Sequence, residues 1–337
     1  MPRRPETLLV MGTGTFRMQF GDAELARLAA VASLGDPVAV DELSSPAVRA
    51  RLRTAEVLIT SWGAPPLDAG TMAAAPALRA VLHAAGSVRS HITSAVFDRG
   101  ILVTTAADAN AEPVARYTLA AILWSLKRVP FIAADTRRHW DGWTHTDPRR
   151  NGLSGIGRTV VLVGFSRIGR RVVALLSPFP DIRIIVVDPV TDPAEIAAAG
   201  AEPALLAEAL PRADVLSLHA PSLPATRCMI GAAELSALPP GATLINTARG
   251  DLIEPKALEL ACLGGLQAIL DVTDPEPLPS SSPLYDLPNV VLTPHVAGSL
   301  GAETRVMTAS ALTELERYVA GLPPLTAVTA ESLKVQA

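Results

Sequence analysis

Short apolar runs alternate with alanine- and leucine-rich stretches of helical period along most of this chain, and this alternation constrains the fold more than any other feature. Repeated strand-then-helix patterns build βαβ units with parallel strands. The candidate strands form two blocks, at residues 7–11, 38–40, 57–60, 80–83 and 101–103, and at residues 159–163, 183–187, 215–218, 243–245, 268–270 and 290–292. Because 337 residues suffice for about two domains, the pattern predicts two α/β domains with doubly wound parallel sheets.

Composition excludes several kinds of partner. The net charge is -4, from 29 Lys+Arg against 33 Asp+Glu, so no basic excess is available to bind nucleic acid. The two cysteines, Cys228 and Cys262, are too few for a disulfide framework and lack the paired spacing of a zinc site. The chain has neither a signal-peptide pattern at its start nor an apolar run long enough to cross a membrane. We therefore expect a cytoplasmic protein without bound metal, nucleic acid or membrane.

Three segments connect or follow the two blocks. Residues 113–127 predict a long helix with proline in its first turn, which links the blocks. Residues 137–151 are polar and aperiodic and predict an exposed loop, whose Trp140 and Trp143 either cover a reacting site or pack in an interface. Residues 303–319 predict a helix, and the tail beyond it is expected to return to the first domain.

A nucleotide-binding turn follows the first strand of the second block. Strand 159–163 runs into Gly164-Phe165-Ser166-Arg167-Ile168-Gly169 and then into a helical stretch, which is the order that a pyrophosphate site requires. Ser166 stands where the dinucleotide pattern has its second glycine, and the turn alone is a weak signal. Asp188, at the end of the next strand, is placed to accept hydrogen bonds from both ribose hydroxyls. Since residues 189–191 contain no arginine for a 2′-phosphate, NAD is favoured over NADP.

Three further segments each follow a candidate strand of the second block, where the carboxyl ends of parallel strands form a ligand crevice. They are Asn246-Thr247-Ala248-Arg249-Gly250, Asp271-Val272-Thr273-Asp274-Pro275-Glu276-Pro277 and Thr293-Pro294-His295-Val296-Ala297-Gly298-Ser299. With the glycine turn, Asp188 and the stretch from Leu218 to Thr226, these segments resemble the D-isomer-specific 2-hydroxyacid dehydrogenase family. The resemblance covers most of the chain, and the motifs are specific because they occur together and in order.

The resemblance implies the domain plan and several site residues. It implies a flavodoxin-like substrate-binding domain formed by residues 1–107 and 300–337, a Rossmann NAD-binding domain at 108–299, a cleft between them and a homodimer. It adds Ala220, Thr247, Ala248 and Gly298 to the cofactor-binding residues, places Asp271 at the nicotinamide side of NAD, and assigns the substrate carboxylate to backbone amides at Ser87 and Val88. Arg89 and Arg116, which stand where relatives usually carry acidic residues, leave the identity of the substrate open.

The chemistry of these side chains agrees with that family. A planar guanidinium binds a carboxylate through two hydrogen bonds, which suits Arg249 to the substrate acid. An imidazole titrates near neutral pH, which suits His295 to exchange a proton with the substrate oxygen. Glu276 would accept the other imidazole N–H and orient the ring. Arg249 and His295 are therefore both predicted to be catalytic and to bind substrate, with Glu276 as the third catalytic residue.

We thus expect an oxidoreductase that transfers a hydride between NAD(H) and a small D-2-hydroxy acid or 2-oxo acid, resembling either glyoxylate and hydroxypyruvate reductases or phosphoglycerate dehydrogenases. One alternative is a catalytically weak NAD-sensing binding module. Another is phosphite oxidation, which uses a similar triad. Formate dehydrogenase shares the fold, but that enzyme type has glutamine at the position of Glu276.

Overall fold

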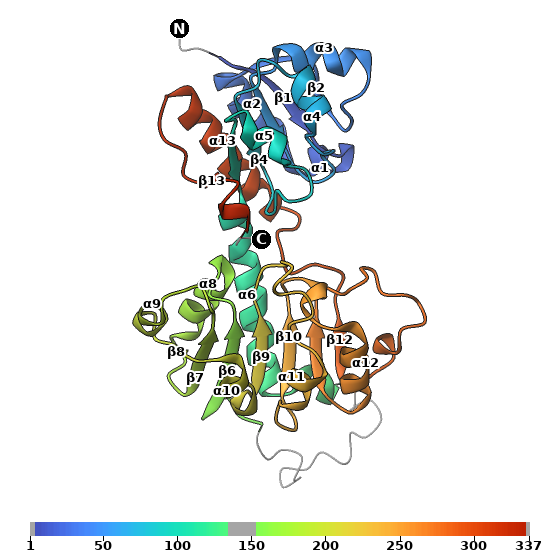
Figure 1. Ribbon diagram of the computed structural model, residues 1–337, viewed down its shortest axis with the longest axis vertical. Helices are drawn as coiled ribbons and strands as arrows, with labels where there is room; N and C mark the ends of the chain where they lie inside the picture. Colours follow the sequence, from blue (N-terminus) through green and yellow to red (C-terminus); the bar gives the residue numbers. More distant parts are fainter. Residues whose placement is uncertain (1–3, 134–152, 335–337) are drawn as a thin grey trace. The chain divides into compact units, whose positions relative to one another are not determined.

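The protein, described by a computed structural model over residues 4–133 and 153–334, forms two compact units (Figure 1). The terminal unit comprises Met1–Ala111 and Ser299–Ala337, and the central unit comprises Glu112–Gly298. The sequence predicted divisions after residues 107 and 299, whereas these units divide after residues 111 and 298. The predicted loop 137–151, with Trp140 and Trp143, lies outside the described residues.

The terminal unit contains a sheet with the strand order β13-β5-β4-β3-β1-β2. Its strands are β1 (Glu6–Val10), β2 (Ser33–Val40), β3 (Val57–Thr60), β4 (Ala80–His83), β5 (Leu102–Thr105) and β13 (Ala327–Val328). Strands β1 to β5 are parallel in the order 2-1-3-4-5, which is the flavodoxin-like arrangement. Strand β13 pairs antiparallel with β5, so the predicted return of the tail to the first domain is confirmed.

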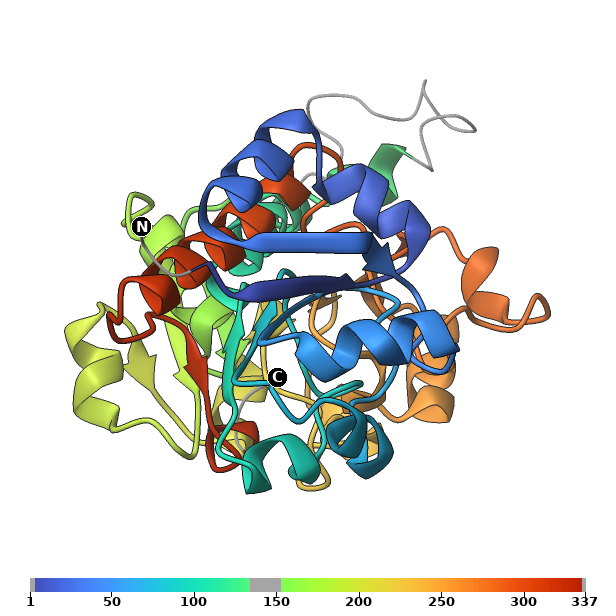
Figure 2. The ribbon, with the colours of Figure 1, turned by 90° about the horizontal axis from the view of Figure 1, so that it is seen from above.

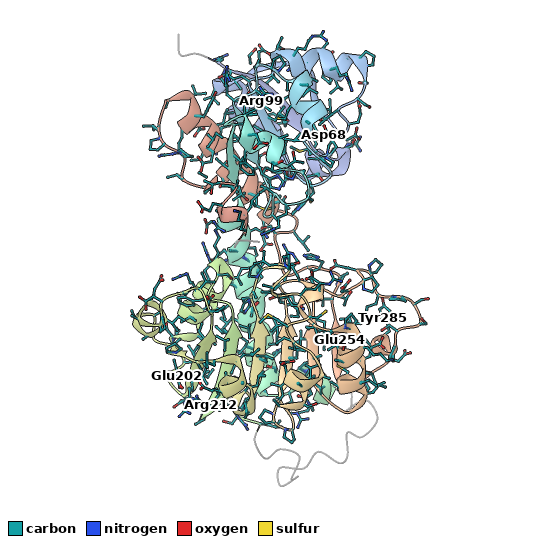
Figure 3. The ribbon with its side chains drawn as sticks, in the orientation of Figure 1. Asp68, Arg99, Glu202, Arg212, Glu254 and Tyr285 are labelled. Atoms are coloured by element: carbon teal, nitrogen blue, oxygen red, sulfur yellow. The ribbon has the colours of Figure 1, made fainter. Side chains whose placement is uncertain are left out.

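Helices cover both faces of this sheet, as Figure 2 shows from above. One face packs against α3 (Pro46–Thr54), α4 (Ala69–Ala74) and α5 (Ser94–Asp98), and the other against α2 (Asp22–Val31) and α13 (Glu303–Val319). A sheet covered on both faces needs strands that are apolar on both faces, and every residue of β3 and β4 is buried. Both ends of α4 are satisfied by side chains labelled in Figure 3: Asp68 accepts from the Thr71 N–H, and Arg99 donates to the carbonyl oxygens of Met72 and Ala75.

The central unit contains a seven-stranded parallel sheet with the order β12-β11-β10-β9-β6-β7-β8. The strands are β6 (Arg158–Val163), β7 (Ile182–Val187), β8 (Glu202–Pro203), β9 (Val215–Leu218), β10 (Thr243–Asn246), β11 (Gln267–Leu270) and β12 (Val290–Leu292). Helices α8 (Arg167–Leu176), α9 (Pro193–Ala198), α10 (Leu206–Ala209), α11 (Ala232–Ser236) and α12 (Pro255–Leu263) lie between them in the chain. The order reverses between β6 and β9, as in a Rossmann fold. The six predicted strands are present, and β8 is a further strand of only two residues.

Two predicted elements start five or six residues earlier than expected. Helix α6 (Ala107–Leu126) begins six residues before Pro113, so the prediction of proline in its first turn was wrong. The helix starts early because Thr105 Oγ1 accepts the Ala107 N–H at 3.2 Å. Strand β2 begins at Ser33, not at residue 38, because an edge strand tolerates the Gly35, Asp36 and Pro37 that obscured it.

Within the described residues, no helix has the length and apolarity needed to cross a membrane.

Candidate active site

The candidate residues of the central unit gather at one edge of its sheet. All seven strands are parallel, so their carboxyl ends meet at that edge. Along the strand order from β12 to β7, the residues that follow the strands are His295, Asp271 with Glu276, Thr247 to Arg249, Ala220, Gly164 to Gly169, and Asp188. The sheet therefore places the catalytic candidates at one end of the edge and the ribose-binding candidate at the other.

The turn between β6 and α8 is built to bring backbone close to a ligand. Gly164 has φ +104, and a Cβ there would lie 2.7 Å from the Ala220 nitrogen, so this turn packs directly on the loop after β9. A Cβ at Gly169 would overlap the Gly164 carbonyl oxygen. Only glycine fits at either position, which agrees with a pyrophosphate-binding turn and with the predicted roles of Gly164, Gly169 and Ala220.

Ser166 is the N-cap residue of α8. Its Oγ accepts the Gly169 N–H at 3.4 Å. Ser166, which stands in place of the second glycine, therefore satisfies one of the free N–H groups at the start of α8. Arg167 and Ile168 are the first two residues of α8, where backbone N–H groups lack intrahelical acceptors and favour an anion. The serine is therefore compatible with the predicted pyrophosphate site.

Asp188 is a half-buried carboxylate held by backbone amides. Its Oδ2 accepts the Phe165 N–H at 2.6 Å, and its Oδ1 accepts the N–H groups of Val190 and Thr191 at 2.8 and 2.9 Å. Burial raises the pKa of this carboxyl, but the three amides together lower it below its usual value. A negative charge at the end of β7 suits ribose hydroxyls and repels a 2′-phosphate.

The structure brings His295 and Glu276 together. His295 Nδ1 lies 2.7 Å from Glu276 Oε1, and both side chains are about half exposed. The pair joins the loops after β11 and β12, which are neighbouring strands. With Nδ1 bonded to the carboxylate, the Nε2 atom of His295 is the one left for a substrate.

Asp271 organises the loop that carries His295. Its carboxylate is 2% exposed and accepts three hydrogen bonds from that loop: from the Thr293 hydroxyl at 2.6 Å, the Val296 N–H at 2.8 Å and the Ala297 N–H at 2.9 Å. The Asp271 carbonyl also accepts the His295 N–H at 2.9 Å. The structure thus shows Asp271 holding the loop, and contact with the nicotinamide stays a prediction.

Arg249 lies in the loop after β10, beside the loop of Glu276. Asn246 closes the Arg249 loop, because its side-chain amide donates to the Arg249 carbonyl at 2.8 Å and accepts the Ala248 N–H at 3.0 Å. A Cβ at Gly250 would overlap the Thr273 carbonyl group, so the loops after β10 and β11 touch. Next in the chain, Glu254 (Figure 3) accepts the Ala257 N–H at 2.6 Å and begins α12.

Three residues of α6 contact these loops and were not predicted from the sequence. The first is Asn110, whose side-chain oxygen accepts the Ser299 N–H at 2.9 Å. The Tyr117 hydroxyl lies 2.9 Å from Thr293 Oγ1, and Thr118 Oγ1 lies 3.0 Å from Thr247 Oγ1. The only sequence signal was a pair of adjacent hydroxyl side chains that lies between Arg116 and the apolar run at residues 119–124.

The remaining candidates are less closely connected. Gly298 is the last residue of the central unit. Ser87 and Val88 belong to the terminal unit and follow β4, and their backbone N–H groups have no hydrogen-bond partner among residues 4–133 and 153–334. Arg89 donates to the Leu333 carbonyl, and Arg116 pairs with Glu112 at 2.9 Å on the surface of α6. Arg89 and Arg116, which stand where relatives usually carry acidic residues, thus each have a contact within their own unit.

The fold and the sheet edge define a dinucleotide-binding α/β protein of the doubly wound class. Residues 119–297 match the model of the NAD binding domain of D-isomer specific 2-hydroxyacid dehydrogenases, and the chain belongs to this family. The predicted family, the predicted pair of parallel-sheet α/β domains and the predicted NAD-binding domain are confirmed.

Individual relatives agree with this assignment. The D-3-phosphoglycerate dehydrogenase of Mycobacterium tuberculosis (strain ATCC 25618 / H37Rv) is 35% identical over 80% of this chain and 51% of its own length. The chain thus spans about half the length of the phosphoglycerate dehydrogenases that it matches. The glyoxylate reductase of Aeropyrum pernix is 34% identical over 80% of this chain and 82% of its own length. The crystal structure of a phosphoglycerate oxidoreductase from Rhizobium etli has a TM-score of 0.81, with 26% identity over 98% of this chain and 100% of that one.

Proposed function

We propose that this chain is an NAD-dependent oxidoreductase that interconverts a small D-2-hydroxy acid and its 2-oxo acid. The observation that carries the proposal is the 2.7 Å contact between His295 and Glu276 on the same sheet edge as the nucleotide turn. Matching relatives named glyoxylate reductase and D-3-phosphoglycerate dehydrogenase support the substrate class.

The residues of the sheet edge fit bound NAD. The backbone at Gly164, Ser166 and Gly169 and the start of α8 would hold the pyrophosphate, and Asp188 would hold the adenosine ribose. Because β9, β10 and β11 continue along the same edge, Ala220, Thr247, Ala248 and Asp271 would lie toward the nicotinamide. When bound, NAD supplies the hydride acceptor or donor.

The catalytic residues would divide binding and proton transfer. Arg249 would bind the substrate carboxylate with its guanidinium. His295 Nε2 takes the proton of the substrate hydroxyl during oxidation and returns one to the carbonyl oxygen during reduction. Glu276 keeps the ring oriented through Nδ1 and stabilises its charged form.

Assembly and location belong to the same proposal. We infer a homodimer in the cytoplasm, supported by the family's usual assembly. The exposed, large apolar side chain of Trp124 on α6 is consistent with a subunit contact. Both cysteines are free, Cys228 half-buried and Cys262 buried, which suits a reducing compartment.

The test is NADH consumption with a panel of 2-oxo acids, namely glyoxylate, hydroxypyruvate, its 3-phosphate, pyruvate and phenylpyruvate, repeated with NADPH. We expect turnover with at least one member and faster turnover with NADH. Clear NADH binding by fluorescence without turnover of any member would reject this function and favour a NAD-sensing module. Adding phosphite and NAD in the same assay tests the alternative function, which is phosphite oxidation.

Variants test the division of roles. We expect His295→Ala to lower kcat by about 10²- to 10⁴-fold, the usual contribution of a general acid or base, with little change in NADH affinity. Glu276→Gln should lower kcat less, and Glu202→Gln is its matched control, because Glu202 forms an exposed ion pair with Arg212 in the same unit (Figure 3). An equal loss of NADH affinity and of kcat in His295→Ala would contradict the proposed role.

A further inference from the structure

Helix α6 reaches two loops of the proposed active site through neighbouring residues. Tyr117 contacts Thr293, in the loop after β12, and Thr118 contacts Thr247, in the loop after β10. Thr118 is fully buried and Tyr117 is half-buried. Because successive helix residues point in directions about 100° apart, one helix turn serves both loops.

The hydrogen bonds that start at Tyr117 have a defined direction. The Thr293 hydroxyl donates its proton to Asp271 Oδ1 at 2.6 Å, so its oxygen accepts the proton of the Tyr117 hydroxyl at 2.9 Å. Burial raises the pKa of the Tyr117 hydroxyl above its usual value, and the charge of Asp271 raises it as well. Tyr117 is therefore a neutral donor at the outer end of a chain that ends on the carboxylate holding the His295 loop.

The His295 loop needs such support because its backbone is strained. His295 has φ +54, a left-handed conformation. This conformation costs a non-glycine residue free energy, so it persists only where the surroundings hold it. Thr293, Val296 and Ala297 hold it by donating to Asp271, but all three belong to the loop itself. In the part of the chain that the structure describes, Tyr117 is the side chain that ties Thr293 to an element outside these loops.

Thr118 has the corresponding position toward Arg249. Its partner Thr247 is 6% exposed and lies between Asn246 and Ala248, whose hydrogen bond closes the Arg249 loop. Loss of the Thr118 hydroxyl would remove the hydrogen bond that fixes the Thr247 side chain. The backbone of the loop would then shift and change the position of Arg249. The two contacts of α6 thus act on different catalytic candidates.

We propose that Tyr117 and Thr118 are positioning residues of the active site, with Tyr117 setting the His295 loop and Thr118 setting the Arg249 loop. The proposal rests on the function proposed above. If His295 moves the proton and Arg249 binds the acid, removing the Tyr117 hydroxyl affects kcat and removing the Thr118 hydroxyl affects the KM of the 2-oxo acid.

The experiment compares Tyr117→Phe, Thr118→Val and Ser125→Ala. Ser125 is the matched control, because its buried hydroxyl on α6 bonds to the Ile122 carbonyl of the same helix and, among residues 4–133 and 153–334, to no other group. For Tyr117→Phe we expect a fall in kcat of about fivefold, which corresponds to one lost hydrogen bond, and a changed pH profile of kcat. For Thr118→Val we expect a similar rise in the KM of the 2-oxo acid, restored by Thr118→Ser. Ser125→Ala should change neither parameter, and NADH affinity should stay constant in Tyr117→Phe and in Ser125→Ala.

Two further readouts separate this proposal from the proposed function. The ¹⁵N signals of the His295 imidazole should shift in Tyr117→Phe and not in Ser125→Ala, and the affinity for oxamate in the presence of NADH should fall in Thr118→Val. Both can be measured even if the protein turns over no 2-oxo acid. That result would reject the proposed function but would leave the positioning roles of Tyr117 and Thr118 open to these two measurements. The proposal is overturned if His295 signals and kcat in Tyr117→Phe, or oxamate affinity and KM in Thr118→Val, match those of Ser125→Ala.

Discussion

At the scale of single residues, two carboxylates of the central unit, Asp271 and Glu276, have different environments. Asp271 is buried and accepts hydrogen bonds from the loop of His295, whereas Glu276 is exposed and faces the imidazole. A buried carboxylate with three donors is a rigid support, and an exposed one can adjust to the charge of its partner. The two side chains therefore suit different tasks, Asp271 as the support and Glu276 as the partner of the proton-transferring ring.

Asp188 leads to a prediction about cofactor preference. Asp188→Ala removes the negative charge at the end of β7 and the acceptor for three backbone amides. We expect the ratio of kcat/KM for NADH over NADPH to fall by about tenfold or more, because the repulsion of the 2′-phosphate is lost. Asp188→Asn, which keeps one acceptor oxygen, should have a smaller effect on NADH affinity. Asp192→Ala is the control, because Asp192 caps the neighbouring α9. An unchanged ratio would remove Asp188 from the site.

At the scale of elements, a buried carboxylate of α13 holds the start of the C-terminal tail. Glu314 of α13 is 3% exposed and accepts the Thr326 N–H and hydroxyl, both at 2.7 Å, and the Leu325 N–H at 3.0 Å. These bonds place the chain just before β13, which then pairs with β5. The tail strand has only two residues, so its position depends on Glu314 more than on the ladder.

We therefore expect Glu314→Ala to destabilise the terminal unit by about 2 kcal/mol, since it removes hydrogen bonds to a charged acceptor and leaves a cavity. Glu316→Ala on the same helix is the control. Glu316 is partly exposed and pairs with Arg27 at 2.7 Å, and such a pair contributes less than about 1 kcal/mol. Urea unfolding gives the two values, and hydrogen exchange of residues 325–328 reports detachment of the tail. Equal effects of the two variants would show that Glu314 does not anchor it.

These elements also show how far the sequence could predict the structure. Helix 303–319 was predicted with the bounds of α13, because its apolar period is clear. Glu314 within it was not recognised as buried, because its partners are contributed by a tail that folds back eleven residues later. In the site, Glu276 and His295 were recognised by the strand ends that they follow, whereas Tyr117 contacts Thr293 across 176 residues. Local patterns predict which strand end a residue follows, but contacts between distant segments depend on packing.

At the scale of the whole molecule, both units bury neutral histidines. In the terminal unit, His83 and His91 are 3% and 2% exposed, have ring centroids 4.4 Å apart and share Thr60 Oγ1. In the central unit, His219 is 3% exposed and bonds to Ser217 Oγ at 3.0 Å. Burial lowers the pKa of His91 to about 4 and that of His219 to about 3, and burial together with the neighbouring His91 charge lowers the pKa of His83 well below 6.5.

These shifts predict a loss of stability in mild acid. Each folded-state pKa lies below the value of 6.5 expected in the unfolded chain, so between pH 6.5 and about 4 the unfolded chain binds more protons. The free energy of unfolding is therefore unaffected by these groups above pH 6.5 and falls as the pH drops below it, by up to about 1.4 kcal/mol per pH unit for each histidine. Urea unfolding across this range measures the slope of the free energy of unfolding against pH. His219→Gln removes one titrating group and should reduce this slope by up to about 1.4 kcal/mol per pH unit, the contribution of one histidine. The same slope in both proteins would mean that His219 is protonated in the folded chain, against its burial behind the nucleotide turn.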